Sequence, residues 1–89
     1  MKVERSVTIA NRNGIHARPA AEIVKAAAKF QSDITITRDD IEVNGKSIMG
    51  VMMLAAEYGS KLKLKADGPD AEQAVNAIAD VIAKKFGES

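Results

Sequence analysis

His16 has the clearest potential for chemistry in this chain, because it is the only histidine and stands where a helix is predicted to begin. A helix N-terminus leaves backbone N–H groups without partners inside the helix, and the helix dipole adds about half a positive charge there. Such a terminus binds phosphate groups readily, and it disfavours protonation of an adjacent imidazole. One ring nitrogen of His16 is then nucleophilic near neutral pH and could accept a phosphoryl group. The alternative is a structural histidine that caps the helix.

The residues that follow His16 suit a phosphoryl group held on its ring. The backbone N–H groups of Ala17 and Arg18, together with the Arg18 guanidinium, would stabilise the charge that develops on the moving oxygens. Residues 1–30 carry six basic and two acidic side chains, whereas residues 31–45 carry one basic and four acidic ones. A positive local field suits an anionic ligand or an acidic partner surface. Scattered, solvated charge is the alternative interpretation.

Ser47 opens a second segment of interest, in which six of the next seven residues are large and apolar. A helical wheel divides the segment into two arcs, with Ile48, Met49 and Met52 on one and Val51, Leu54 and Ala55 on the other. A two-turn surface helix buries only one arc. The arc with two methionines would then face solvent and suit adaptable protein contacts. A fully buried element is the alternative, and Ser47 is also an ordinary N-cap residue.

The apolar pattern predicts seven elements that position these residues. Alternation predicts strands over residues 3–9, 33–38, 41–44 and 61–66. Helical spacing predicts one helix that begins within a residue or two of His16, with Pro19 in its opening turn, and another that follows Asp70. Asp70 and Gln73 have the spacing of a capping box. With the short helix after Ser47, the order predicts an α+β fold whose helices cover one face of a small sheet.

Length and composition exclude several classes of protein. The 89 residues allow a single domain, 1–89, with a thin core. The absence of Cys removes disulfides and thiolate catalysis, and one histidine argues against a zinc site, so we expect no metal and no cofactor. No apolar stretch approaches the roughly 20 residues needed to span a bilayer. A net charge of +1 argues against nucleic-acid binding. We expect a cytoplasmic monomer that binds neither membrane nor nucleic acid.

Two motifs carry a resemblance to a known family. They are G-I-H-A-R-P-A at residues 14–20, which fixes His, Arg and Pro within four residues, and N-G-K-S-I-M-G at residues 44–50. Together they resemble the HPr family, the phosphocarriers of the bacterial phosphoenolpyruvate-dependent sugar phosphotransferase system, and the similarity runs over essentially the whole chain. The resemblance implies an HPr-like open-faced β-sandwich, in which a four-stranded antiparallel sheet carries three helices on one face.

The resemblance also implies a phosphoryl carrier without turnover of its own, rather than an enzyme. His16 corresponds to the histidine that takes a phosphoryl group on Nδ1 from phospho-enzyme I and passes it to enzyme IIA domains for sugar uptake. Arg18 corresponds to the arginine that assists this transfer. Ser47 corresponds to the serine that the ATP-dependent HPr kinase/phosphorylase modifies. The implied partner-binding surface consists of Lys25, Ile48, Met49 and Met52.

Two other functions remain open from the sequence. One is an HPr variant specialised for regulation, either in the nitrogen-related branch of the system or as a cofactor of catabolite repression. The other is a small ACT-like binding module, whose order of elements is superficially similar. Such a module needs no histidine at a helix start, so phosphoryl transfer from enzyme I would separate it from a carrier.

Overall fold

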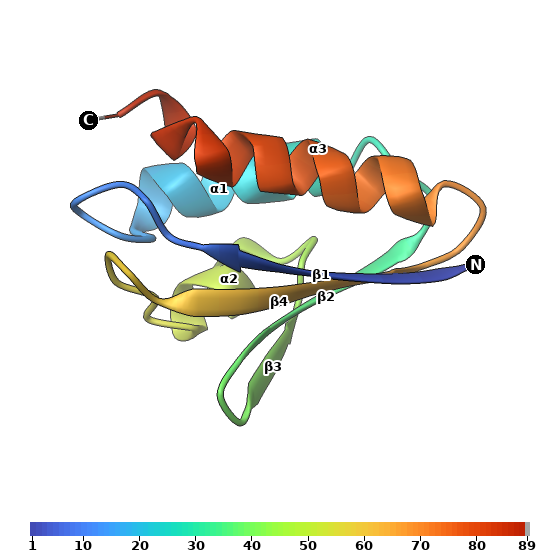
Figure 1. The fold of residues 1–89 in the computed structure, drawn as a ribbon, viewed down its shortest axis with the longest axis horizontal. Helices are drawn as coiled ribbons and strands as arrows, with labels where there is room; N and C mark the ends of the chain where they lie inside the picture. Colours follow the sequence, from blue (N-terminus) through green and yellow to red (C-terminus); the bar gives the residue numbers. More distant parts are fainter. Residues whose placement is uncertain (89) are drawn as a thin grey trace.

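The chain forms a four-stranded antiparallel sheet and three α-helices, as predicted (Figure 1). A computed structural model describes residues 1–88, so that Ser89, the last residue of the predicted domain, lies outside the described residues. The strands and helices match the predicted order, and a short 3₁₀ turn after the last helix was not predicted. The elements are β1 (Lys2–Thr8), α1 (Ala17–Ala27), β2 (Asp33–Arg38), β3 (Ile41–Asn44), α2 (Ile48–Met53), β4 (Lys61–Asp67), α3 (Ala71–Ala83) and η1 (Lys85–Gly87).

The strands lie in the order β1-β4-β2-β3, which the sequence pattern did not reveal. β4 occupies a central position and pairs antiparallel with both β1 and β2. The side chains of β4 alternate between the two faces of the sheet, so that Leu62 and Leu64 are buried while Lys61 and Lys63 are exposed on the opposite face. A central strand with lysines on one face shows that only the other face of the sheet is covered.

Helices α1 and α3 cover the apolar face of the sheet, and α2 packs beside α1 and β3 (Figure 1). Both long helices direct a stripe of small and aliphatic side chains into one core. The described residues include no helix that is long and apolar enough to cross a membrane. The large aliphatic side chains of the core that are completely or almost completely buried are Ile9, Ile23, Ile36, Val51, Leu54, Leu62, Leu64, Val75, Ile78 and Ile82.

Asp70 precedes α3 as predicted, but the predicted capping box is wrong, because neither the Asp70 nor the Gln73 side chain makes a capping hydrogen bond within residues 1–88. The Asp70 side chain makes no hydrogen bond to the first turn of α3. Its carboxylate instead accepts hydrogen bonds from the Ser32 hydroxyl at 2.6 Å, and from the backbone N–H groups of Ser32 and Gln31 at 2.9 Å each. The residues just before β2 thus take the hydrogen bonds of the carboxylate that the capping box would have directed to the first turn of α3. The Ser32 hydroxyl and the Gln31 N–H hold the pKa of Asp70 below its usual value.

The lowered pKa of Asp70 predicts an acid-dependent loss of stability. Because the folded state binds the proton more weakly than the unfolded state, the contribution of Asp70 is fully present above about pH 4 and is lost as pH falls through the folded-state pKa. Asp70→Asn should lower the free energy of unfolding at neutral pH, and its difference from the unsubstituted protein should shrink at about pH 3. Urea titrations at both pH values measure this. Asp67→Asn, at the end of β4, is the control, and an equal pH dependence in both variants would contradict the assignment.

Candidate functional site

His16 is the residue immediately before α1, with an extended backbone (φ −104°, ψ −169°). Its carbonyl accepts the first bond of the helix, from the Ala20 N–H at 2.9 Å, and Pro19 is buried in the opening turn, as predicted. The His16 side chain is 46% exposed and makes no capping hydrogen bond to the helix. The alternative of a structural capping histidine is therefore wrong.

The loop before His16 is held against the segment that follows α2. The Ile15 N–H donates to the Ala56 carbonyl at 2.8 Å. Gly14 adopts φ +67°, and a Cβ atom there would lie 2.5 Å from the same carbonyl oxygen. Only glycine tolerates both the left-handed backbone and the close approach. This contact places the start of α1 at the same end of the molecule as α2 (Figure 1).

The first turn of α1 presents unused donors beside the imidazole. The N–H groups of Ala17 and Arg18 make no hydrogen bond to any residue in the range 1–88, as expected at a helix N-terminus. Pro19 has no N–H, so the N–H groups of Ala17 and Arg18 are the free backbone donors of this turn. The Arg18 side chain is exposed and forms no ion pair with residues 1–88. The predicted group of His16, Ala17 and Arg18 is thus together at one exposed helix start.

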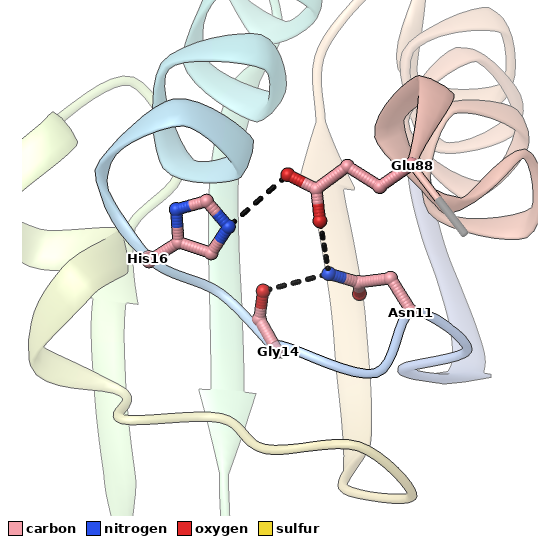
Figure 2. A network of polar contacts seen from close by, with 4 residues as sticks. All are labelled: Asn11, Gly14, His16 and Glu88. Carbon is pink, nitrogen blue, oxygen red and sulfur yellow. Dashed lines mark hydrogen bonds and ion pairs between the residues drawn. The ribbon is translucent and has the colours of Figure 1, made fainter.

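Glu88 completes the surroundings of His16, and no sequence pattern predicted its presence there. Figure 2 shows the carboxylate between two partners: Oε2 lies 3.1 Å from His16 Nε2, and Oε1 accepts from Asn11 Nδ2 at 3.0 Å. Asn11 is fully buried, and its Nδ2 also donates to the Gly14 carbonyl at 2.8 Å. The turn before His16 and the segment after α3 are thereby joined by one polar network. His16 and Glu88 are 72 positions apart in the sequence, so no local pattern could have predicted the contact.

The backbone after α3 is bent to bring Glu88 to this position. Lys85 and Phe86 adopt left-handed conformations, with φ of +58° and +55°. Such conformations cost about 1–2 kcal/mol for each residue other than glycine. Burial of the Phe86 side chain and a hydrogen bond from the Glu88 N–H to the Lys85 carbonyl, at 2.8 Å, offset this strain.

The contact with Glu88 determines which ring nitrogen is free. An ionised carboxylate only accepts hydrogen bonds, so the Nε2 contact requires a proton on His16 Nε2. In the neutral imidazole, Nδ1 then carries the lone pair. No residue in the range 1–88 forms a hydrogen bond with Nδ1, which lies on the side of the ring away from Glu88 (Figure 2). The imidazole can therefore act as a nucleophile through Nδ1.

Ser47 caps α2, and the helix exposes one apolar arc as predicted. The Ser47 hydroxyl accepts from the Gly50 N–H at 3.1 Å, so its role as N-cap is real. Val51 and Leu54 are buried, whereas Ala55, expected in the same arc, lies past the helix end and is exposed. The alternative of a fully buried element is wrong. The exposed large apolar side chains of α2 are Ile48, Met49 and Met52, as predicted, together with Met53, which was not.

Arg38 lies beside the C-terminal end of α2, and Lys25 lies in the last turn of α1. Arg38, on β2, donates from Nη1 to the carbonyls of Leu54 and Ala55 at 3.0 and 3.2 Å, which satisfies the C-terminal end of α2. Lys25 is exposed on α1. Seven residues separate it from Arg18, so both lie on the same face of the helix, about two turns apart.

The described residues contain no group of three or more His, Cys, Asp or Glu side chains that could hold a metal ion.

Comparison with known proteins assigns the chain to a family. A family model described as "PTS HPr component phosphorylation site" matches residues 3–84. Phosphocarrier protein HPr of Treponema pallidum is 52% identical over 86 residues, which cover 97% of this chain and 98% of that protein. The crystal structure of HPr-C-His from Thermoanaerobacter tengcongensis has a TM-score of 0.93 at 47% identity and 98% coverage of both chains. The HPr dimer from the same organism has a TM-score of 0.78 at 50% identity, with 92% of this chain and 97% of that chain covered. The chain belongs to the HPr family of phosphocarrier proteins of the phosphotransferase system.

Proposed function

We propose that His16 accepts a phosphoryl group on Nδ1 from phospho-enzyme I and passes it to enzyme IIA domains in sugar uptake. The observation that carries this proposal is the free Nδ1 of an exposed His16 beside the unused N–H groups of Ala17 and Arg18. Partners must reach the acceptor nitrogen, and the incoming phosphoryl oxygens need donors. Both requirements are met at the start of α1.

The transfer needs positioning and charge stabilisation more than bond chemistry by the carrier. The Nδ1 lone pair forms a new N–P bond as the bond between phosphorus and enzyme I breaks. The His16 Nε2 proton stays in place and faces the Glu88 carboxylate. The Ala17 and Arg18 N–H groups, with the Arg18 guanidinium, stabilise the equatorial oxygens. In the onward step the same N–P bond breaks, and the imidazole is the leaving group, so the carrier is regenerated without turnover of its own.

Ser47 is the proposed regulatory site, modified by an HPr kinase/phosphorylase. Its hydroxyl caps α2 and lies next to the exposed Ile48, Met49 and Met52, which we assign to partner docking together with Lys25. A phosphate on Ser47 adds about two negative charges at a helix N-terminus, a position where negative charge is favourable. The backbone should therefore change little, and the effect should fall on docking to an acidic partner surface.

Ser47→Asp should weaken binding to enzyme I about 10-fold while the fold stays intact, because aspartate is also a good N-cap. Calorimetry of the complex and circular dichroism of the variant measure the two properties. Ser47→Asn is the matched control, since it keeps the size and capping ability of aspartate without the charge, and it should bind normally. Equal affinities of the two variants would remove this account of regulation.

The sequence also allowed an ACT-like module and a regulatory HPr variant. The family match over residues 3–84 removes the ACT-like module. A variant specialised for catabolite repression would need Ser47 but no accessible acceptor nitrogen, so the exposed His16 favours the carrier over that variant. The nitrogen-related branch shares the His-Ala-Arg-Pro motif, and the identity of the enzyme IIA domain that takes the phosphoryl group from His16 distinguishes it from sugar uptake. A carrier that works with enzyme I and enzyme IIA acts in the cytoplasm, and we expect it to act as a monomer.

A relay assay tests the proposal. Radiolabelled phosphoenolpyruvate, enzyme I and this chain should give a phosphorylated carrier, and addition of an enzyme IIA domain should move the label onward. A chain that accepts the label but never donates it would be a regulatory variant, and a chain that never accepts it would contradict the proposal.

A further inference from the structure

We infer that Glu88 is a positioning residue that holds His16 in the tautomer with the proton on Nε2 and thereby directs the phosphoryl group to Nδ1. The inference rests on the proposed carrier function and assigns a role to a residue that the sequence did not single out. The carboxylate is 15% exposed and lies 3.1 Å from Nε2. Its effect on the reacting nitrogen is indirect, because it contacts the opposite side of the ring (Figure 2).

Asn11 determines how Glu88 meets the imidazole. The Asn11 Nδ2 group faces two acceptors, the Gly14 carbonyl and Glu88 Oε1. Its Oδ1 is buried without a hydrogen-bond partner among residues 1–88. A rotated amide would point Oδ1 at two oxygens, so the orientation with Nδ2 toward Glu88 is the favourable one. Asn11 therefore donates a hydrogen bond from Nδ2, and Glu88 must accept it at Oε1.

This geometry distinguishes Glu88 from a chance surface ion pair. Exposed pairs contribute little because their long side chains are free to move. Here one carboxylate oxygen is held by a fully buried asparagine, while Phe86 anchors the preceding backbone in the core. The strained conformations of Lys85 and Phe86 bring the carboxylate to the ring. Strain of this kind is found at sites where a side chain must be held in one place.

The same contact supports the transfer step. As the N–P bond forms at Nδ1, positive charge develops on the ring and on the Nε2–H group. A carboxylate hydrogen-bonded to that group stabilises the charge without taking the proton, as a buried aspartate does for the histidine of a protease triad. Glu88 thus acts twice, first by leaving the lone pair on Nδ1 and then by stabilising the phosphorylated ring.

Substitution by glutamine gives the sharpest test, because Asn11 dictates how the new amide must lie. Glu88→Gln has to place its carbonyl oxygen toward Asn11 Nδ2 and its NH₂ group toward the ring. His16 Nε2 then has to accept a hydrogen bond, and the proton moves to Nδ1. Glu88→Ala leaves the ring to water and removes the tautomer preference without reversing it. Glu88→Gln should therefore slow phosphorylation of His16 more than Glu88→Ala does.

NMR of the imidazole nitrogens in the unphosphorylated protein reads the tautomer directly. We expect the Nε2–H form in the unsubstituted chain, a mixture in Glu88→Ala and the Nδ1–H form in Glu88→Gln. The initial rate of phosphorylation by phospho-enzyme I should fall about 10-fold in Glu88→Ala and about 100-fold in Glu88→Gln. Glu57→Gln is the control for loss of one negative charge, because the Glu57 side chain makes no polar contact with residues 1–88. It should leave the tautomer and the rate unchanged.

The outcomes separate this inference from the proposed function. An unchanged tautomer in Glu88→Gln, or a glutamine variant that transfers better than the alanine variant, overturns the positioning role while the carrier function stands. A tautomer that responds as expected in a chain that enzyme I never phosphorylates instead overturns the proposed function. Circular dichroism of each variant should show an intact fold, since Glu88 lies outside the core.

Discussion

His16→Ala is expected to abolish acid-labile phosphorylation by enzyme I and phosphoenolpyruvate completely. The variant loses the only imidazole of the chain, and no other residue in the range 1–88 offers a nitrogen nucleophile beside unused helix N–H groups. The fold should persist, because the His16 side chain is half exposed and makes no capping hydrogen bond. Incubation with radiolabelled phosphoenolpyruvate, followed by an acid quench and a parallel neutral sample, measures the loss.

Two controls make this result decisive. Ser47→Ala removes the other proposed phosphorylation site and should be labelled by enzyme I at the normal level. Circular dichroism and thermal unfolding of His16→Ala should match those of the unsubstituted protein. Acid-labile label in His16→Ala would show that a different residue accepts the phosphoryl group, and the carrier site proposed here would then be wrong.

Arg18→Ala is expected to slow phosphoryl transfer about 100-fold with little change in stability. Removing one preorganised group that stabilises charge in a transition state typically costs this much. The Arg18 side chain is exposed and unpaired within residues 1–88, and alanine is the best helix former, so the folded state loses almost nothing. Rapid-quench measurement of the transfer from phospho-enzyme I gives the rate, and urea titration gives the free energy of unfolding.

Lys25→Ala is the matched control for Arg18→Ala, because Lys25 is also a cation on the same face of α1. It lies about two turns from His16 and should alter the concentration dependence of transfer without lowering the rate at saturation. Arg18→Lys should recover part of the rate, since it keeps the charge but not the paired donors. A destabilised Arg18→Ala variant that transfers at the normal rate would contradict the role given to Arg18.

The fold could be predicted because its information is local. Alternation of the kind seen in β4, where Leu62 and Leu64 are buried between exposed lysines, identifies a strand with one covered face. The order of the strands could not be predicted, because alternation says which side chains point inward but not which strand lies alongside. The capping box at Asp70 failed for a similar reason. Its carboxylate is bonded to Gln31 and Ser32, which lie far away in the sequence.

The candidate site likewise has one part that the sequence predicts and another that only the folded structure reveals. His16, Ala17 and Arg18 are consecutive, and a helix start places their donors and ring together without help from the rest of the chain. Asn11 lies in the turn just before His16, but Glu88 reaches the site only because α3 crosses the molecule and the chain then turns at Phe86. Polar networks that join distant segments leave no periodic signal in a sequence, so the group that holds the ring was visible only in the folded structure.

The most direct test of this account is to identify the atom that carries the phosphoryl group. Isotope-labelled protein is phosphorylated with enzyme I and phosphoenolpyruvate, and NMR of the imidazole nitrogens shows which one is bonded to phosphorus. The account predicts phosphorus on Nδ1 of His16, with Nε2 protonated and facing Glu88. Phosphorus on Nε2, or on any residue other than His16, would contradict it.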